Sequence, residues 1–301
     1  MNYSESIPDD GSINFSHFIV EDILELHHKC PGSLFQVASQ FNCLEFPSPH
    51  QKPEDGISRY VFDFTQGPAC SLACAASTVV RNYFSGQSHQ SQINNLVELE
   101  KFFLENLGRN PTEFWEIKNG YSFSSEEKLK MLNQVLSNLS PEIIDLITRK
   151  VRVGAQTPCE VTFESRWKLC REKVEVSQVF CSALSCGYNY SVPITLWEHF
   201  AQIVLNGMYE GTILCGILEK INGSGTGEIY LTKLGGGVFG NENLWIARAI
   251  ARALCLYKNY NVKVFLCHYM KLETSFVKMI DDEMKKNDIL VNVKRPQTIF
   301  Q

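Results

Sequence analysis

The segment IYLTKLGGGVFGN, from Ile229 to Asn241, runs directly into ENLWIARAIARALCLY, and together they predict a strand, a glycine-rich turn and an amphipathic helix. Gly235, Gly236 and Gly237 are consecutive and Gly240 follows, so backbone N–H groups in the turn can approach a ligand closely and positive φ angles cost little. The helix after the turn directs its first N–H groups and the positive end of its dipole at the same place. The pattern favours a phosphate or pyrophosphate site, although a tight connection without a ligand has the same composition.

The segments on either side of this turn indicate the fold class. Residues 176–189 predict a strand followed by a loop of small residues, and an apolar helical pattern begins near Leu196. After the second helix, NVKVFLCHY alternates apolar and polar residues from Asn261 to Tyr269, as a strand does. Strands that alternate with helices predict an α/β sheet whose ligand lies beyond the carboxyl ends of the strands.

At this point the sequence resembles the macrodomains, which are α/β/α modules that bind ADP-ribose. Gly237-Val238-Phe239-Gly240 matches the loop with which that family wraps the diphosphate and the distal ribose. LFQVASQFNCLEF, from Leu34 to Phe46, takes the place of the family's strand that leads to a ribose-binding asparagine, and Asn42 is the matching residue. TQGPACSLACAASTVVRNYF, from Thr65 to Phe84, takes the place of the first glycine-rich loop and its helix, with Gly67 as its only glycine.

The strings VASQFNCLE, TQGPAC, RNYF, VSQVFCSAL and LGGGVFGN, together with the EDG turn at residues 54–56, resemble more narrowly the MavL-like class of macrodomains. Members of that class are (ADP-ribosyl)hydrolases that remove single ADP-ribose units from arginine. The resemblance implies a three-layer α/β/α core with a mixed sheet, ADP-ribose as ligand and a mono-ADP-ribosylated protein as substrate. The residues expected to bind the ligand are Asn42, Gln66, Gly67, Gly235, Gly236, Gly237, Val238, Phe239, Gly240 and Asn241.

Hydrolysis of an ADP-ribosyl–guanidine bond passes through an oxocarbenium-like transition state that carboxylates stabilise. Acids beside the expected ligand loops are therefore the catalytic candidates, and we select Asp55, Asp63 and Glu242, of which two are expected to act. Asp55 could instead be a plain turn residue, and Glu242 could only complement a helix dipole. No metal and no cofactor are expected, because the glycine loop and the helix dipole already neutralise a diphosphate.

Aromatic residues follow both predicted strands. Phe239 is expected to pack against the distal ribose or the diphosphate, as the resemblance implies. Tyr188 and Tyr190 follow the strand in residues 176–189 and could line the adenine pocket, or could simply pack a loop on the core.

The chain is predicted to contain a flexible tail at residues 1–15 and one macrodomain-like domain at 16–301. A helical insertion is expected at about residues 85–150. Its helices are predicted within Ser91–Gly108, after a serine cap at Ser124 or Ser125, and after Ser140-Pro141. Residues 151–163 alternate like a strand that could belong to the sheet or contact a substrate.

Composition narrows the function classes further. The formal net charge of −5 argues against broad nucleic-acid binding, and no apolar run approaches the roughly 18–20 residues of a membrane span. The first residues lack a secretory signal, so a cytoplasmic location is expected. The 11 cysteines include no CxxC pair and are interpreted as small buried apolar residues.

Two other functions remain open at this point. One is a reader that binds ADP-ribose without cleaving it, because such a protein would share the glycine loop. The other is a cysteine-dependent hydrolase built on Cys70 or Cys181, for which the sequence offers no adjacent histidine.

Overall fold

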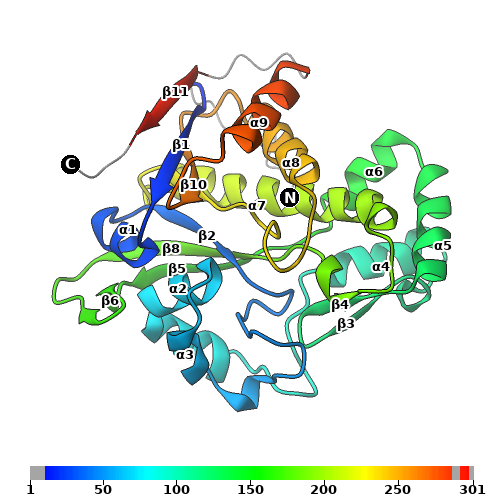
Figure 1. The fold of residues 1–301 in the computed structure, drawn as a ribbon, viewed down its shortest axis with the longest axis horizontal. Coiled ribbons are helices and arrows are strands. Elements are labelled where there is room, and N and C mark those ends of the chain that lie inside the picture. The colour runs from blue at the N-terminus through cyan, green and yellow to red at the C-terminus, as the bar shows by residue number, and fades with distance from the viewer. Residues whose placement is uncertain (1–10, 287–291, 298–301) are drawn as a thin grey trace.

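The computed structural model describes residues 11–286 and 292–297, which fold around a seven-stranded sheet with helices on both faces (Figure 1). The strand order is β11-β1-β10-β9-β2-β8-β5, and every neighbouring pair is parallel except β5 with β8. The strands are β1 (Asn14–Val20), β2 (Leu34–Ala38), β5 (Gly154–Glu160), β8 (Glu175–Cys181), β9 (Glu228–Leu231), β10 (Lys263–Tyr269) and β11 (Asn292–Gln297). The sheet is therefore mixed, as expected.

Two layers of helices cover this sheet. The helices on one face are α1 (Ile23–Lys29), α2 (Gln66–Ala73) and α3 (Ala75–Tyr83), and those on the other are α7 (Glu198–Ile221), α8 (Asn243–Leu256) and α9 (Thr274–Lys286). Strand side chains alternate between the two faces: Leu34 belongs to the core under α7 and α8, whereas Phe35 stacks on His27 of α1 at 3.8 Å between ring centroids. The three-layer α/β/α architecture predicted from the sequence is confirmed.

The strands and helices predicted around the glycine turn are present, with β9 ending at Leu231 rather than at Leu234.

The prediction of a flexible tail at residues 1–15 needs a correction. β1 begins at Asn14 and pairs with β10, and Ile13 and Phe15 are fully buried, so the expected flexible tail extends too far along the chain. Residues 1–10 of that tail lie outside the described residues. The sequence NFSHFIV hid this strand because Ser16 and His17 interrupt its apolar pattern.

An insertion separates α3 from the edge strand β5. It contains α4 (Val97–Asn106), α5 (Glu126–Ser137), α6 (Pro141–Thr148) and a hairpin of β3 (Glu116–Lys118) and β4 (Tyr121–Phe123). The predicted caps are present in part, since Ser125 accepts a hydrogen bond from the N–H of Lys128 and Pro141 begins α6. The hairpin was not predicted, although Asn119 and Gly120 at its turn both have positive φ, as a two-residue turn requires.

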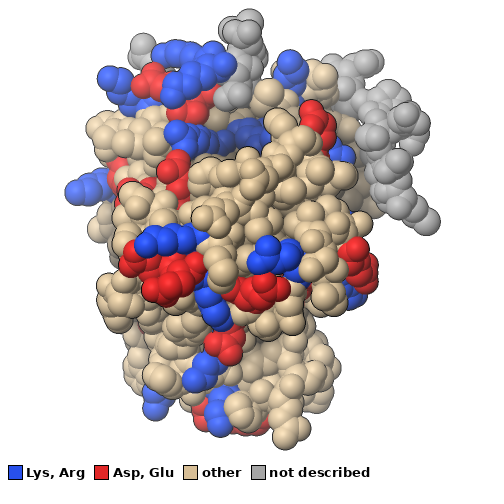
Figure 2. All heavy atoms as spheres, turned by 90° about the vertical axis from the view of Figure 1, so that its right-hand side faces the viewer, with Lys and Arg blue, Asp and Glu red and all other residues tan. Residues whose placement is uncertain are grey.

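The insertion packs on the α7 side of the molecule and forms its right-hand part in Figure 1. Trp115 contacts Phe200 of α7 at 4.6 Å between ring centroids, so insertion and sheet share one core. Figure 2 shows this face, where basic and acidic side chains adjoin one another. The ion pairs of this region include Arg149–Asp145 and Arg152–Glu98.

The segment Ile194–Ile221, which includes α7, is long and apolar enough to cross a membrane by length and composition. The sequence interpretation overlooked this segment. Because 67% of its apolar window is buried inside the molecule, it behaves here as a central core helix.

Candidate functional site

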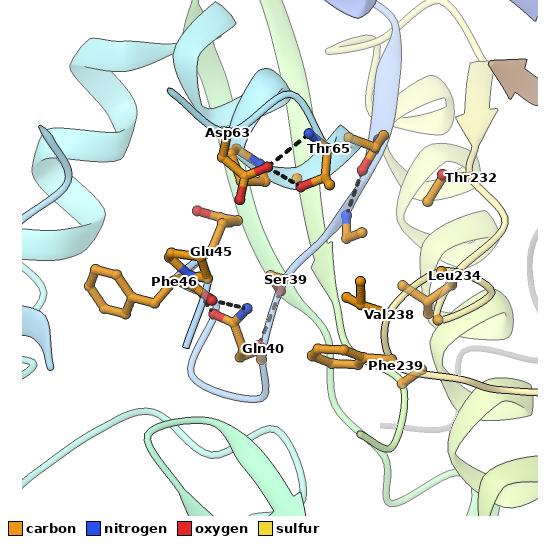
Figure 3. Close-up of a pocket in the computed structure, with 18 of the residues that line it drawn as sticks. Ser39, Gln40, Glu45, Phe46, Asp63, Thr65, Thr232, Leu234, Val238 and Phe239 are labelled. Carbon is orange, nitrogen blue, oxygen red and sulfur yellow. Dashed lines mark hydrogen bonds between the residues drawn. The ribbon is translucent and has the colours of Figure 1, made fainter. Parts of the chain in front are cut away.

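A cavity of about 470 Å³ opens where β2 and β9 end. Figure 3 shows Glu45 and Phe46 on one side of this cavity and Val238 and Phe239 on the other. The residues that line it are Ala38, Ser39, Gln40, Glu45, Phe46, Pro47, Asp63, Thr65, Gln66, Gly67, Pro68, Tyr121, Ala183, Tyr188, Thr232, Lys233, Leu234, Gly235, Gly237, Val238 and Phe239. The glycine turn and the TQGP segment, far apart in the sequence, therefore meet at one site, as the sequence predicted.

The glycine loop is closed by its own backbone. Gly235 and Gly240 have φ of 74° and 70°, which L side chains rarely adopt. The N–H of Asn241 donates to the carbonyl of Gly235 at 3.0 Å, and its side-chain Nδ2 donates to the carbonyl of Leu184 at 2.7 Å. Gly240 and Asn241 therefore shape the loop and, like Gly236, do not line the cavity.

The closed loop leaves three successive backbone donors without a partner. Within the residues that the structure describes, the N–H groups of Gly237, Val238 and Phe239 donate no hydrogen bond. All three residues line the cavity, and a Cβ built on Gly237 would meet nothing within 4 Å. Successive free amides in a turn form a concave site for an anion.

The N-terminus of α2 supplies a second set of donors to the same cavity. Thr65 is its N-cap, and within the described residues the N–H groups of Gln66 and Gly67 in its first turn donate no hydrogen bond, while Pro68 has no N–H to offer. A Cβ on Gly67 would lie 1.8 Å from the carbonyl oxygen of Ala38, so only glycine allows α2 to approach β2 this closely. The single glycine of this segment is thus required by packing.

Gln66 holds the end of β2 in place. Its Oε1 accepts from the N–H of Ala38 and its Nε2 donates to the carbonyl of Gln36, both at 2.8 Å. Because the side-chain amide is used on both sides, Gln66 acts mainly as a positioning residue, although it lines the cavity as expected.

An aromatic wall closes one end of the cavity. The rings of Tyr121, Tyr188 and Phe239 lie 5.0–5.9 Å apart, in tilted and edge-on arrangements. The Tyr121 hydroxyl donates to the carbonyl of Phe46 at 2.5 Å. Tyr188 was expected here, but Tyr190 is exposed and does not line the cavity. Tyr121 comes from the unpredicted hairpin, and its only sequence signal was the preceding Asn-Gly pair.

Asp63 is one of the two acids that line the cavity. Its Oδ1 accepts from the N–H of Thr65 at 2.9 Å and from the Thr65 hydroxyl at 2.6 Å, and these bonds fix the orientation of the carboxylate. Within the described part of the chain, its Oδ2 accepts no hydrogen bond. Burial raises the pKa of Tyr121, the neighbouring Tyr188 raises it further, and the Asp63 charge adds to the rise. Asp63 thus has one oxygen available to a ligand or a water.

Glu45, the other lining acid, is already engaged. Both of its oxygens accept from Nη2 of Arg81, at 3.0 and 3.2 Å, and Oε2 also accepts from the Ser71 hydroxyl at 2.7 Å. Burial raises the pKa of Glu45, and the Arg81 charge opposes that rise. The Arg81 guanidinium lies 3.8 Å above the centre of the Phe180 ring. The buried Arg81–Glu45 ion pair therefore anchors the loop at residues 39–47 to α3.

Asn42 does not occupy the position expected for a ribose contact. It is fully buried and does not line the cavity. Its Nδ2 donates to Gln92 at 2.8 Å and its Oδ1 accepts from the N–H of Leu44 at 3.1 Å. Asn42 therefore shapes the loop, and the polar residues of this loop that line the cavity are Ser39, Gln40 and Glu45.

Two of the three expected catalytic acids also lie outside the cavity lining. Asp55 is exposed and accepts from the backbone N–H of Lys52 at 2.9 Å, as a turn residue does. Glu242 is the N-cap residue of α8. Their positions agree with the alternatives of a turn residue and a dipole-complementing residue, and they argue against direct catalytic roles.

Several lining residues had been missed by the sequence analysis. Gln40 forms two hydrogen bonds with the backbone of Phe46, through Nε2 at 3.0 Å and Oε1 at 2.9 Å, so the loop curls over the cavity. Lys233 directs its ammonium group to Glu273 at 2.7 Å. The distant partner of Lys233 leaves no local signal in the sequence, whereas Gln40 bonds within its own loop.

The described residues include a single cluster with metal-ligand chemistry, formed by His28, Glu164 and Cys170. Their ligand atoms lie within 4.8 Å of one another, and none of the three lines the cavity. His28 lies 3.6 Å from the Glu164 carboxylate, and Lys168 already forms an ion pair with that carboxylate.

The two cysteines considered as nucleophiles are unsuited to that role. Cys70 and Cys181 are fully buried and do not line the cavity. Burial raises the pKa of the Cys181 thiol to about 12 and that of Cys70 well above its usual range, which keeps both protonated.

Comparisons with known proteins identify similar solved structures. No family model and no curated protein matches the sequence. Poly(ADP-ribose) glycohydrolase from Deinococcus radiodurans in complex with ADP-ribose shares 13% identity over 92% of this chain and 87% of that one, with a TM-score of 0.46. A second crystal form gives 11% identity over 93% and 87%, with a TM-score of 0.47. A macrodomain mutant from Oceanobacillus iheyensis with ADPR gives 10% identity over 93% and 95%, with a TM-score of 0.38. These likenesses are too weak to carry a functional assignment, so the cavity itself must carry it.

Proposed function

We propose that this chain is a macrodomain-type hydrolase that binds ADP-ribose and removes single ADP-ribose units from modified arginine side chains. The observation that carries the proposal is the cavity between two sets of backbone donors: the free amides of Gly237, Val238 and Phe239, and the first turn of α2. An aromatic wall and the Asp63 carboxylate complete it.

The dimensions and polarity of the cavity suit a nucleotide diphosphate. Its volume of about 470 Å³ lies within the roughly 300–1,000 Å³ of small-molecule sites. Backbone amides at a nest and at a helix N-terminus bind phosphate oxygens without a counter-charge from lysine or arginine. We therefore propose that ADP-ribose binds with its diphosphate on residues 237–239 and its distal ribose between Phe239 and Asp63.

Asp63 is the proposed catalytic carboxylate. In the reaction, a water oxygen forms a bond to the anomeric carbon while the bond from that carbon to the guanidine nitrogen breaks. The free Oδ2 of Asp63 can accept the water proton and then pass it to the neutral guanidine released when the C–N bond breaks, so that arginine leaves as the guanidinium cation and Asp63 is ionised again. The negative charge also stabilises the oxocarbenium-like transition state. One free acid is thus proposed in place of the expected pair.

Arginine as the linkage is the finer part of the proposal. It is supported by the resemblance to MavL-like sequences and by the match between a carboxylate and a planar guanidinium. A reader that binds ADP-ribose without cleaving it would use the same amides. The available oxygen of Asp63 favours the enzyme, because a reader has no need of an oriented acid beside the ribose.

The test is a release assay on peptides that carry mono-ADP-ribose on arginine, glutamate or serine. The wild-type protein should release ADP-ribose from the arginine peptide. Asp63→Asn should lower turnover by at least about a hundredfold, because the amide keeps the contacts to Thr65 but loses the charge. Asp55→Asn and Glu242→Gln serve as matched controls and should retain turnover, since neither residue lines the cavity.

Calorimetry with ADP-ribose separates the outcomes. Asp63→Asn should still bind the ligand, which assigns its defect to the chemical step. Binding by the wild type with no release from any peptide would identify a reader. Full turnover by Asp63→Asn would remove Asp63 from the mechanism, and release from serine or glutamate alone would overturn the arginine linkage.

A further inference from the structure

A short hairpin lies beside the loop that carries Asp63. It consists of β6 (Phe163–Ser165) and β7 (Lys168–Leu169), with Arg166 and Trp167 at its tip. Arg166 donates through Nη1 to the carbonyl of Val61 at 2.5 Å and through Nη2 to the carbonyl of Asp63 at 3.1 Å. The hairpin tip is therefore fixed to the backbone of the proposed catalytic residue.

Three large aromatic side chains are exposed at this junction. Phe62 is 77% exposed, Phe64 is 70% exposed and Trp167 is 79% exposed. The Arg166 guanidinium lies 4.0 Å above the centre of the Phe64 ring, so the hairpin tip and the Asp63 loop form one surface. We name Phe62, Phe64 and Trp167 the aromatic rim. All three lie on the two segments that Arg166 connects, and exposed apolar residues that gather in one area of a surface mark interaction sites.

The rim adjoins the mouth of the cavity. Phe62 and Phe64 are the chain neighbours of Asp63, whose side chain lines the cavity together with that of Thr65. In the proposed reaction the bond to be broken lies at Asp63. The polypeptide that carries the modified side chain must therefore leave the cavity on this side, where the rim begins.

We propose that the aromatic rim is the docking surface for the polypeptide of the ADP-ribosylated substrate, next to its modified residue. This inference rests on the proposed function. Exposed aromatic rings contribute most to the free energy of binding when apolar side chains of a partner cover them. Buried aromatic residues also supply much of the binding energy of protein interfaces. The preferred substrate is thus a segment with apolar side chains immediately beside the modified arginine, held by the rim while the cavity holds ADP-ribose.

The experiment measures affinity in the Asp63→Asn background, where the substrate is expected to remain intact. The probes are free ADP-ribose and two mono-ADP-ribosylated arginine peptides of equal length, one with leucine and phenylalanine beside the arginine and one with glycine and serine. The apolar peptide should bind more tightly than the other two probes. Adding Trp167→Ala or Phe62→Ala should weaken its binding by about tenfold and leave the affinity for free ADP-ribose unchanged.

Leu104→Ala is the matched control, because Leu104 is an exposed apolar residue of α4 that does not line the cavity. It should change none of the three affinities. Equal affinity for both peptides, or an apolar-peptide affinity that survives loss of Trp167 and Phe62, would overturn the docking proposal while ADP-ribose binding stands. If ADP-ribose itself does not bind the wild type, the proposed function fails, and the docking proposal fails with it.

Discussion

The two loops that face each other across the cavity are built by different means. The glycine loop at residues 232–241 is closed largely by its own hydrogen bonds, such as that from the N–H of Asn241 to the carbonyl of Gly235. The loop at residues 39–47 also has internal bonds, such as those of Gln40 with Phe46, but it depends in addition on partners far along the chain, above all on Arg81, which binds the Glu45 carboxylate. A loop closed by local contacts can be recognised from its residues, whereas a loop held by distant partners cannot.

The largest effect should come from removing the distant anchor. Arg81→Leu leaves the buried Glu45 carboxylate without its cation and should lower the free energy of unfolding by about 3–5 kcal/mol. Urea denaturation measures this loss. Lys101→Ala breaks an exposed ion pair with Glu98 and should leave the free energy of unfolding nearly unchanged, because solvent screens such pairs. An Arg81→Leu protein as stable as the Lys101→Ala control would show that the loop does not depend on this anchor.

A smaller effect should follow from a Cβ inside the locally closed loop. Gly235 has φ of 74°, and its Cβ would lie 2.3 Å from that of Ala183, so Gly235→Ala should destabilise the fold by at least about 1–2 kcal/mol. Gly237→Ala should change stability by less than about 0.5 kcal/mol, because its Cβ meets nothing within 4 Å. Thermal unfolding of the two variants compares them directly. Equal losses would mean that the loop is not closed as described.

The difference between the loops explains what the sequence could predict. Gly235, Gly237 and Phe239 could be recognised from the local sequence, because closely spaced glycines between a strand and a helix predict a tight turn. Asp63 was selected because it lies just before TQGPAC, the expected first ligand loop. These four residues line the cavity, and their contacts with ADP-ribose stay a prediction.

Asn42 shows where sequence reasoning failed. The string around it matched a family motif, but its side chain packs against the insertion. A Cβ on Gly120 would lie 2.7 Å from Oδ1 of Asn42, and Nδ2 of Asn42 donates a hydrogen bond to Gln92. The same hairpin brings Tyr121 into the cavity. Because the pairing of Asn42 with the insertion spans distant parts of the chain, only the folded structure could reveal it.

β1 was missed for a different reason. Its polar residues include His17, whose Nδ1 lies 2.9 Å from Nε2 of His268 on the neighbouring strand β10. Burial lowers the pKa of His17 to about 4, so the imidazole is neutral at physiological pH and is tolerated in the interior. A buried polar residue that bonds to a partner on the neighbouring strand interrupts the apolar pattern of its own strand. The sequence alone therefore does not indicate a strand there.

The central claim is that the free amides of residues 237–239 bind the diphosphate of ADP-ribose. Titration calorimetry of ADP-ribose into the wild type and into Gly237→Trp, with thermal unfolding of both, tests it most directly. We expect the wild type to bind ADP-ribose and Gly237→Trp to lose binding through a direct clash with the ligand. The unfolding temperature should stay unchanged, because a side chain at this position points into open space. An unchanged ADP-ribose affinity in a folded Gly237→Trp protein would show that the diphosphate does not bind at residues 237–239.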